Sequence, residues 1–503
     1  MPSLKEIADA THGDLMSVFG NHTYNYKFKP FDHQMKALDR GLGKYEFGYF
    51  MEMGTGKSKV LIDNIGILYL AEKINFALII APKGVYRNWV SKEIPEHMSD
   101  DVAYRIIRWV ASPNKKQQAE MRSVKEPFDG LTIFVMNVEA FSSVKGRTAG
   151  EWMGRALGAK GLIAIDESTT IKNHKAKRTK ALINIAWEFK YKRLLTGSPI
   201  TKSPMDIYSQ CEFLRPGLLN YESYYAFQNR YAVINKRTMG AHSFQQIVGY
   251  KNLEELTDKI DQFTFRVLKK DCLDLPEKIY TARYVTMTKE QERMYKSIQE
   301  SALVMLDSGD LVSAPAVITQ LLRLQQVLSG HLKTDDGDTV YFESNRIQAL
   351  LDCLQEHNGK ALIWSRFRHD IQTITEALKK EYGEECASAY YGDTSDDERN
   401  DIVMRFQKSN ALRFFVGNPA TAGYGLTLTE ADLVIYYAND FNLETRIQSE
   451  DRAHRIGQKN NVTYIDLVTE GTIDERIVKA LQDKIEIGAT VLGEQAREWL
   501  TLQ

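Results

Sequence analysis

A glycine-rich loop near the start of the chain has residue types that can hold phosphate. The loop MEMGTGKS at 51–58 lies between a short aromatic run and an apolar-periodic stretch, which predicts strand, loop and helix. Glycines let backbone N–H groups face phosphate oxygens, and a helix N-terminus favours negative charge. Lys57 can reach the terminal phosphates and Ser58 can hold Mg²⁺. We predict nucleotide contacts from Met53, Gly54, Thr55, Gly56, Lys57 and Ser58, although Met51 stands where the full phosphate-loop pattern has glycine.

Two adjacent carboxylates, Asp166 and Glu167, end the apolar run at 161–165. At a strand end both would project beyond the sheet edge, where Asp166 can hold Mg²⁺ and Glu167 can orient or deprotonate an attacking water. An acidic strand end is otherwise common as a helix cap. Because a phosphate loop precedes the pair in this chain, we favour the catalytic interpretation.

Late in the chain, the segment QSEDRAHRIGQ at 448–458 sets Arg452 and Arg455 three residues apart. A bound nucleotide is hydrolysed efficiently when cations from elsewhere in the protein reach its γ-phosphate, and these arginines are candidates for that role. Gln448, at the start of the segment, is predicted to contact the nucleotide. A charged helix end is the alternative, which the upstream phosphate loop makes improbable.

Three other segments are candidates with open alternatives. The amide of Gln34 offers a donor and an acceptor that suit adenine, but such a residue is more often a surface helix position. The segment TGSP at 196–199 either faces the nucleotide or is a plain turn. The segment TAGYGLTLT at 421–429, which includes Gly425, lets backbone approach a ligand closely or packs against a helix.

Composition sets wider limits on the class of protein. The chain has 503 residues, 43% hydrophobic and 26% charged, which fits two or three globular domains. No apolar run is long enough to cross a membrane. The first residues lack a secretory pattern, so we expect a cytosolic location. The four cysteines lie far apart without a CxxC pair, which predicts free thiols and no structural zinc.

Any nucleic-acid surface must be local, because the net charge is −1. The best candidate is the stretch IKNHKAKRTK at 171–180, which has no acidic residue and can neutralise several phosphates. We call residues 171–180 the basic loop. A solvated surface loop without a nucleic-acid partner is the alternative.

Short apolar runs alternate with helical patterns, which predicts an α/β fold with parallel sheets covered by helices. In such sheets ligands lie outside the carboxyl ends of the strands. The stretch from about 204 to 345 looks mainly helical and aromatic-rich. We expect strands at 47–50, 77–81, 132–136, 162–165 and 193–195, and again at 361–364, 388–391, 413–416, 433–437 and 463–467.

Taken in order, these segments resemble the motif series of superfamily 2 helicases, specifically the Swi/Snf-type DNA-translocating ATPases. The resemblance covers most of the chain and is strongest at 53–58, at Asp166 and Glu167, at 195–199 and in DRAHRIGQ at 451–458. Secondary matches include Asn88-Trp89 with Glu93. The family usually continues its acidic pair with glycine and histidine, whereas this chain has Ser168-Thr169. Coupling of hydrolysis to DNA contact through that pair is therefore not carried over.

The resemblance implies two RecA-like lobes with helical insertions, in a compact prokaryotic or bacteriophage-like form. We expect an ATP-binding lobe at 1–275 with a helical protrusion from about 204. A second lobe is expected at 276–503, with a helical insertion to about 345 and a C-terminal helix. ATP and Mg²⁺ would lie between the lobes, faced by Arg452 and Arg455. Candidate DNA contacts are Lys83, Arg87, Asn88, Lys172, Lys175, Lys177, Arg178, Ser365, Arg366 and Thr421.

The function implied by the resemblance is an ATP-dependent translocase or helicase on duplex or branched DNA, active in fork or junction remodelling and branch migration. It would act in the cytoplasm, or in that of a host cell if phage-encoded. A nucleotide-gated DNA clamp with little turnover and an RNA-directed helicase are the alternatives. The sequence carries no prediction of oligomeric state.

Overall fold

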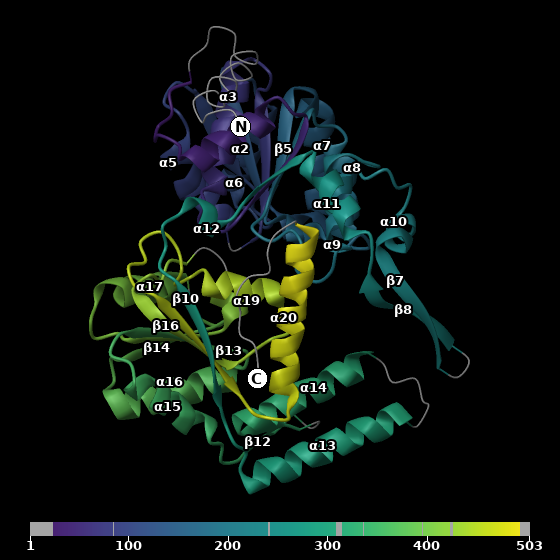
Figure 1. Cartoon of the computed structure of the whole chain (residues 1–503). Helices are drawn as coiled ribbons and strands as arrows, with labels where there is room; N and C mark the ends of the chain where they lie inside the picture. Colours follow the sequence, from purple (N-terminus) through teal and green to yellow (C-terminus); the bar gives the residue numbers. More distant parts are fainter. Residues whose placement is uncertain are drawn as a thin grey trace, which may run out of the picture. The chain divides into compact units, whose positions relative to one another are not determined.

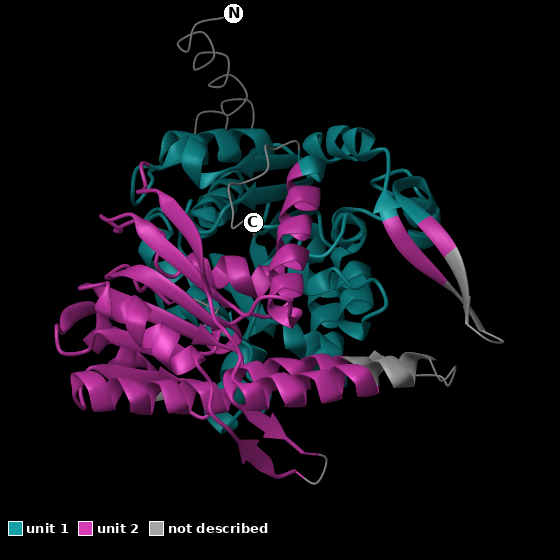
Figure 2. Cartoon of the chain, turned by 60° about the horizontal axis from the view of Figure 1, so that its bottom comes forward, with its two compact units in different colours: residues 1–233, 249–273, 490–494 teal, residues 234–248, 274–489, 495–503 magenta. Residues whose placement is uncertain are grey.

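The computed structural model describes residues 24–83, 85–239, 242–307, 314–334, 337–394, 396–422 and 426–492. The chain divides into two compact units, coloured separately in Figure 2. Unit 1 comprises residues 1–233, 249–273 and 490–494, and unit 2 comprises 234–248, 274–489 and 495–503. The bounds predicted from the sequence for the two lobes, 1–275 and 276–503, stay predictions.

Unit 1 is organised around the parallel sheet that contains β5 in Figure 1. Its strand order is β3-β4-β2-β5-β6-β1-β9. Continuous apolar runs form its central strands because both faces are covered by other parts of the unit, and every residue of β2 and β5 is buried. All five strands predicted for this half are present. The bounds are β1 Glu46–Met51, β2 Phe76–Ala81, β3 Tyr104–Arg108, β4 Leu131–Asn137, β5 Gly161–Asp166, β6 Tyr191–Leu195 and β9 Thr264–Val267.

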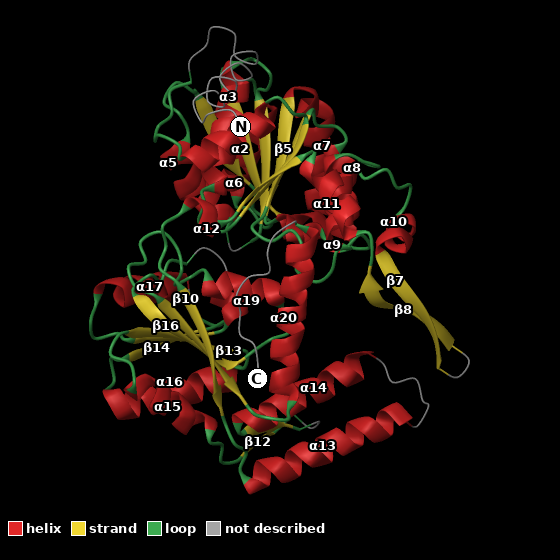
Figure 3. Cartoon of the chain, viewed as in Figure 1, coloured by secondary structure: helices red, strands yellow, loops and turns green. Residues whose placement is uncertain are grey.

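Helices pack around this sheet (Figure 3). Helix α3 (Lys57–Leu70) is buried over most of its length because apolar residues occupy nearly all its faces, as in a helix enclosed within a unit. The others are α2 Asp32–Leu42, α4 Tyr86–Asn88, α5 Ile94–His97, α6 Lys115–Arg122, α7 Val144–Leu157, α8 Lys177–Ala186, α9 Asp206–Leu214, α10 Tyr224–Tyr231, α11 Leu253–Asp261 and α12 Lys269–Cys272. A π-helical turn, Trp89–Glu93, follows α4.

Unit 2 has a second parallel sheet, in the order β10-β17-β16-β13-β15-β14. The five strands predicted for this half are present, and β10 adds one that was not predicted. The α/β fold class with two parallel sheets is therefore confirmed. The bounds are β10 Lys278–Tyr284, β13 Lys360–Ser365, β14 Ala387–Tyr390, β15 Phe414–Gly417, β16 Ala431–Ala438 and β17 Val462–Val468.

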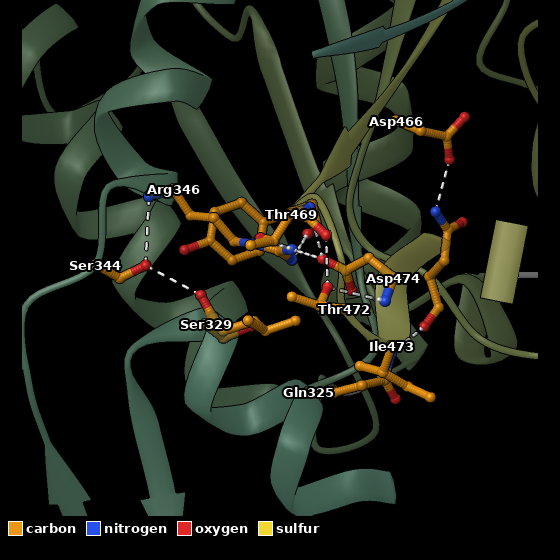
Figure 4. A network of polar contacts seen from close by, with 12 residues as sticks. Gln325, Ser329, Ser344, Arg346, Asp466, Thr469, Thr472, Ile473 and Asp474 are labelled. Atoms are coloured by element: carbon orange, nitrogen blue, oxygen red, sulfur yellow. Dashed lines mark hydrogen bonds and ion pairs between the residues drawn. The ribbon is translucent and has the colours of Figure 1, made fainter. Parts of the chain in front are cut away.

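A buried arginine joins several elements of unit 2 (Figure 4). Arg346 donates to the Tyr437 carbonyl at 2.6 Å and to Thr469 Oγ1 at 3.2 Å, and it forms an ion pair with Asp474. These contacts tie the start of one helix to the ends of two strands. The helices are α13 Lys289–Asp307, α14 Ala314–Ser329, α15 Arg346–Gln355, α16 Arg368–Tyr382, α17 Asp396–Lys408, α18 Pro419–Ala422, α19 Leu443–Glu450 and α20 Ile473–Val491.

The stretch from about 204 to 345 is more mixed than predicted. It holds helices α9 to α14 but also strands β7 to β12. Two of the strand pairs form two-stranded sheets, β7 (Ala232–Met239) with β8 (His242–Tyr250) and β11 (His331–Lys333) with β12 (Thr339–Tyr341). Local patterning missed these strands because their apolar residues are interrupted by polar ones, as expected for partly exposed strands.

Among the described helices, none has the length and apolar character needed to cross a bilayer. The four cysteines, Cys211, Cys272, Cys353 and Cys386, are free thiols. No group of three or more histidine, cysteine, aspartate or glutamate side chains within the described ranges is arranged to hold a metal ion.

Candidate functional site

The glycine-rich loop joins β1 to α3 as predicted. Gly54 and Gly56 have φ values of 82° and 88°, a left-handed conformation that glycine adopts without steric cost. The Thr55 hydroxyl donates to the Glu52 carbonyl at 2.8 Å and closes the turn. Lys57 is the first residue of α3 and is buried. The loop therefore presents a helix N-terminus and a lysine together, the arrangement that binds phosphate.

Gln34 lies directly against this loop. Its Nε2 donates to the Thr55 carbonyl at 3.1 Å, and its Oε1 accepts from the Phe31 backbone at 3.0 Å. A Cβ added at Gly56 would lie 2.0 Å from the same Nε2, so only glycine fits beside this amide. In this structure Gln34 holds the loop, and its role with adenine stays a prediction.

Asp166, at the end of β5, is buried and held from two sides. Its Oδ2 accepts from the Trp89 indole at 2.9 Å and its Oδ1 from the Glu167 backbone at 3.0 Å. Burial raises the pKa of Asp166, while the nearby charge of Lys57 acts in the opposite direction. The predicted lysine thus lies near enough to the predicted metal-holding carboxylate for its charge to lower the pKa of that carboxyl.

Glu167 has a backbone conformation that is unusual for its residue type. Its φ is 49°, in the left-handed region that costs non-glycine residues energy. Its side chain is half-buried, unlike that of Asp166. The two neighbouring carboxylates therefore differ in burial, and Glu167 also has the less common backbone conformation.

A third acidic residue, Glu93, lies at the same site. Its carboxylate accepts hydrogen bonds from the Asn88 amide at 3.0 Å and from the Ser58 hydroxyl. Burial raises the pKa of Glu93, and the charge of Asp166 raises it further. A serine that donates its proton to a carboxylate leaves its oxygen lone pairs free for a cation.

These donors fit Mg²⁺. The ion prefers oxygen ligands and is usually held by one or two carboxylates, with phosphates and waters completing its shell. Asp166 and Ser58 supply a carboxylate and a hydroxyl beside the phosphate loop. They would hold the ion together with the phosphates of the nucleotide.

The loop after β6 packs on the phosphate loop. A Cβ added at Gly197 would lie 3.1 Å from the Met53 backbone nitrogen, closer than most such contacts allow. Thr196 is buried, and its Oγ1 accepts from the Ser198 backbone at 3.2 Å. The segment at 196–199 therefore adjoins the candidate nucleotide site as well as forming a turn.

The candidate DNA contacts of unit 1 differ in exposure. Four of them, Lys83, Arg87, Lys175 and Lys177, are exposed. The others are partly buried and bonded within the protein: the Asn88 amide donates to Glu93, Lys172 Nζ to Thr201 Oγ1 at 2.7 Å and Arg178 Nε to the Thr170 carbonyl at 3.0 Å. The four exposed side chains are better suited to phosphate contact than the partly buried ones.

In unit 2 the two arginines of the late segment converge on one carbonyl. Arg452 and Arg455 each donate through Nη1 to the Leu426 carbonyl at 3.1 Å. Arg452 Nε also donates to the Gln448 carbonyl at 2.9 Å, and Arg452 is only 1% exposed, whereas Arg455 is half-buried. Leu426 belongs to the predicted segment 421–429, so the structure brings these two sequence candidates together.

Helix α19, which precedes the arginines, is anchored by buried charges. Arg446 donates to Asp466 at 2.5 and 3.0 Å and to Glu450 at 2.9 Å. Glu450 also accepts from Lys278 at 3.0 Å and Tyr280 at 2.8 Å. Although burial alone would raise it, Lys278 and Arg446 lower the pKa of Glu450 to about 2. The arginine segment thus begins from a fixed helix.

The other candidates of unit 2 are placed as follows. The Ser365 hydroxyl is buried and donates to Asp370 at 2.6 Å, so it supports the strand end and does not face solvent. Arg366 donates to Gln325 at 3.1 Å. Thr421 lies in the short helix α18 and is partly buried. Gly425 lies outside the described residues.

Sequence reasoning assigned no role to Trp89, Glu93 or Gln210. Trp89 and Glu93 had a detectable signal, because a tryptophan and a glutamate four residues apart follow β2, where ligand-binding loops are expected. Gln210 had none, since nothing in the local pattern of α9 separates it from a core position.

Two family models match this chain, one after the other. The SNF2-related domain matches residues 49–331, more than half of the chain, and the helicase conserved C-terminal domain matches 345–457. A probable chromatin-remodelling complex ATPase chain of Oryza sativa subsp. japonica is 25% identical over 97% of this chain and 43% of its own. An uncharacterised ATP-dependent helicase of Mycoplasma genitalium is 25% identical over 92% and 42%.

The chain thus spans less than half the length of these relatives. Their names, ATPase and ATP-dependent helicase, agree with the class of enzyme expected from the sequence. Among solved structures, the Sulfolobus solfataricus SWI2/SNF2 ATPase core in complex with dsDNA has 26% sequence identity and a TM-score of 0.41, over 93% of this chain and 94% of the other.

Proposed function

Because the chain belongs to the SNF2-related family, we propose that it couples ATP hydrolysis to movement along duplex or branched DNA. Remodelling of forks or junctions, with branch migration, is the specific activity proposed. The observation that carries the proposal is the glycine loop, which ends with Lys57 as the first residue of α3, together with the buried Asp166 that Trp89 holds at the end of β5.

In this proposal unit 1 binds and hydrolyses ATP. The phosphate loop holds the phosphates through backbone N–H groups and Lys57, while Asp166 and Ser58 hold Mg²⁺, which supplies charge stabilisation to the transferred phosphoryl group. Glu167, half-buried beside Asp166, orients the attacking water and accepts its proton. Trp89 and Glu93 keep the two metal-holding side chains in place.

Arg452 and Arg455 are proposed to reach the γ-phosphate and to complete the site. Their shared carbonyl at Leu426 holds both guanidinium groups in one place. Nucleotide would then bias a two-state cycle in which the lobes close with ATP and reopen after hydrolysis. Positive charge contributed by a second domain is a large factor in such reactions.

DNA would be held mainly through phosphates. The exposed Lys83, Arg87, Lys175 and Lys177 follow strand ends of unit 1 and suit contacts that tolerate any sequence and weaken with salt. The relatives named for chromatin remodelling are more than twice as long, and the present proposal concerns movement on naked DNA. A cytoplasmic location, in the host if phage-encoded, is part of the same proposal.

The test is to measure ATP hydrolysis by the pure protein with duplex DNA, single-stranded DNA and duplex RNA, and branch movement on a synthetic four-way junction. We expect the largest stimulation by duplex or branched DNA. Absence of both DNA-stimulated hydrolysis and branch movement would refute a motor. Stronger stimulation by RNA would favour the RNA-directed alternative.

Glu167→Gln separates a motor from a nucleotide-gated clamp, because it removes the base but keeps the shape of the side chain. A motor loses hydrolysis and branch movement together and keeps ATP binding, whereas a clamp keeps its function. Glu120→Gln, on the exposed face of α6, is the matched control and should change neither activity.

A further inference from the structure

Helix α9 presents one face to two functional loops of unit 1. Asp206, Ser209 and Gln210 lie three and four residues apart, so their side chains share a side of the helix. All three are buried. Each makes hydrogen bonds to loops that follow β5 or β6, so this face joins segments distant in sequence.

Gln210 links the loop after the catalytic carboxylates to the loop after β6. The Ser168 hydroxyl donates to Gln210 Oε1 at 2.6 Å, and Gln210 Nε2 donates to the carbonyls of Pro199 and Asp206, each at 2.8 Å. Both ends of the amide are thus bonded. Because Ser168 directly follows Glu167, a movement of Glu167 would shift Ser168 and, through Gln210, the loop at Pro199.

The same helix face also holds the start of the basic loop. The Ser209 hydroxyl donates to the Ile171 carbonyl at 2.7 Å. Asp206 Oδ2 accepts from the backbones of Thr201 and Lys202 at 3.0 and 2.7 Å, and Thr201 Oγ1 in turn accepts from Lys172. The catalytic turn, the loop after β6 and the basic loop therefore meet on one helix.

We propose that α9 relays the state of the nucleotide site from Glu167 to the basic loop, with Ser168 and Gln210 as its positioning residues. This relay rests on the proposed function, and it assigns to Ser168, through Gln210, a coupling that the resemblance did not carry over to the Ser168-Thr169 pair. The network is buried and satisfied, and such networks transmit a shift because each bond left unmade is costly. A purely structural role for the same bonds is the competing explanation.

The experiment uses the full chain with Ser168→Ala, Gln210→Met and the double variant. Ser99→Ala is the control, because Ser99 is a buried serine whose hydroxyl accepts from the Asp101 backbone at 3.3 Å. The first readout is ATP hydrolysis with and without saturating duplex DNA. The second is hydrogen–deuterium exchange of residues 171–180 with and without a non-hydrolysable ATP analogue.

We expect each single variant to lower the DNA stimulation of hydrolysis by about fivefold, as for the loss of one buried hydrogen bond, with DNA-free hydrolysis little changed. The double variant should be no worse than the more affected single variant, because both break the same link. The analogue should change exchange in the basic loop of the wild type and of the control, but not in the three variants.

Three results would overturn the relay. Additive effects of the two substitutions, or losses matched by Ser99→Ala, would indicate a structural role. The third is an unchanged exchange of the basic loop when the analogue binds the wild type. Should the wild type show this exchange but no DNA-stimulated hydrolysis, the relay would stand and the proposed motor function would fail.

Discussion

The indole Nε1 of Trp89 donates a hydrogen bond to the carboxylate of Asp166 at 2.9 Å, and both side chains are buried. The two residues are 77 positions apart in the chain. Since the other oxygen of Asp166 accepts from the Glu167 backbone, the plane of the carboxylate is fixed. Trp89 therefore positions the residue that is proposed to hold Mg²⁺.

Trp89→Phe keeps an aromatic ring in the core but removes this donor. We expect the rate of ATP hydrolysis to fall by about tenfold at limiting Mg²⁺ and less at high Mg²⁺, with about 1–2 kcal/mol of unfolding free energy lost. Hydrolysis across a Mg²⁺ titration and urea unfolding measure the two effects. Trp109→Phe is the control, because the buried Trp109 Nε1 has no hydrogen-bond partner within the described structure. An unchanged Mg²⁺ dependence would contradict the assignment.

Arg452 and Arg455 are expected to differ when each is changed to alanine. Both variants should keep ATP binding, but their rate of ATP hydrolysis should fall by about a hundredfold or more. The reason is that no other cation takes the place of the lost guanidinium group. Arg452→Ala should also cost about 2 kcal/mol of stability, because this buried side chain bonds two backbone carbonyls. Arg455→Ala should cost less. Equal loss of binding and hydrolysis, measured with a fluorescent ATP analogue and a phosphate assay, would contradict the role.

Sequence patterning predicted the two sheets well because their strands are nearly continuous apolar runs. It missed β3, β9 and β10, where residues such as Arg105, Arg266 and Arg283 interrupt the run. The glycine loop and the strand-ending carboxylates were likewise visible, because their chemistry is local. Their roles in catalysis stay predictions until they are tested.

The contacts that organise the site were not predictable in the same way. The bonds from Trp89 to Asp166 and from Ser168 to Gln210 span 77 and 42 residues, and only tertiary packing decides them. The sequence also did not show which candidate side chains are exposed. Ser365 and Lys177 are both polar candidates for DNA contact, yet one is buried against Asp370 and the other is exposed.

The charge network under α19 predicts an acid-sensitive contribution to stability. Because the folded pKa of Glu450 is about 2, below its usual value near 4.5, its stabilisation is present above about pH 4.5 and is lost as pH falls toward 2. Glu450→Gln should cost about 3 kcal/mol at pH 7, since it breaks a buried pair, and the difference from wild type should shrink in that acid window. Urea unfolding at several pH values measures it.

The exposed ion pair of Arg283 with Glu356 provides the control for that measurement. Glu356→Gln breaks a pair of similar length, 2.7 Å, but at the surface, where solvent screens the charges. Its effect should lie within experimental error at every pH. A loss from Glu450→Gln that stays constant down to pH 3 would show that Glu450 is not the titrating group.

The salt dependence of DNA binding should identify which lysines of the basic loop contact phosphate. Lys175→Ala and Lys177→Ala should each lower the slope of log affinity against log salt by about 1, since each exposed ammonium releases one counterion. Lys172→Ala should change the slope less, because Lys172 Nζ is bonded to Thr201 Oγ1. Lys115→Ala, exposed on α6, is the control for net charge. Fluorescence anisotropy with a labelled duplex at several salt concentrations measures the slope, and equal slopes for Lys115→Ala and Lys175→Ala would exclude the basic loop as the DNA contact.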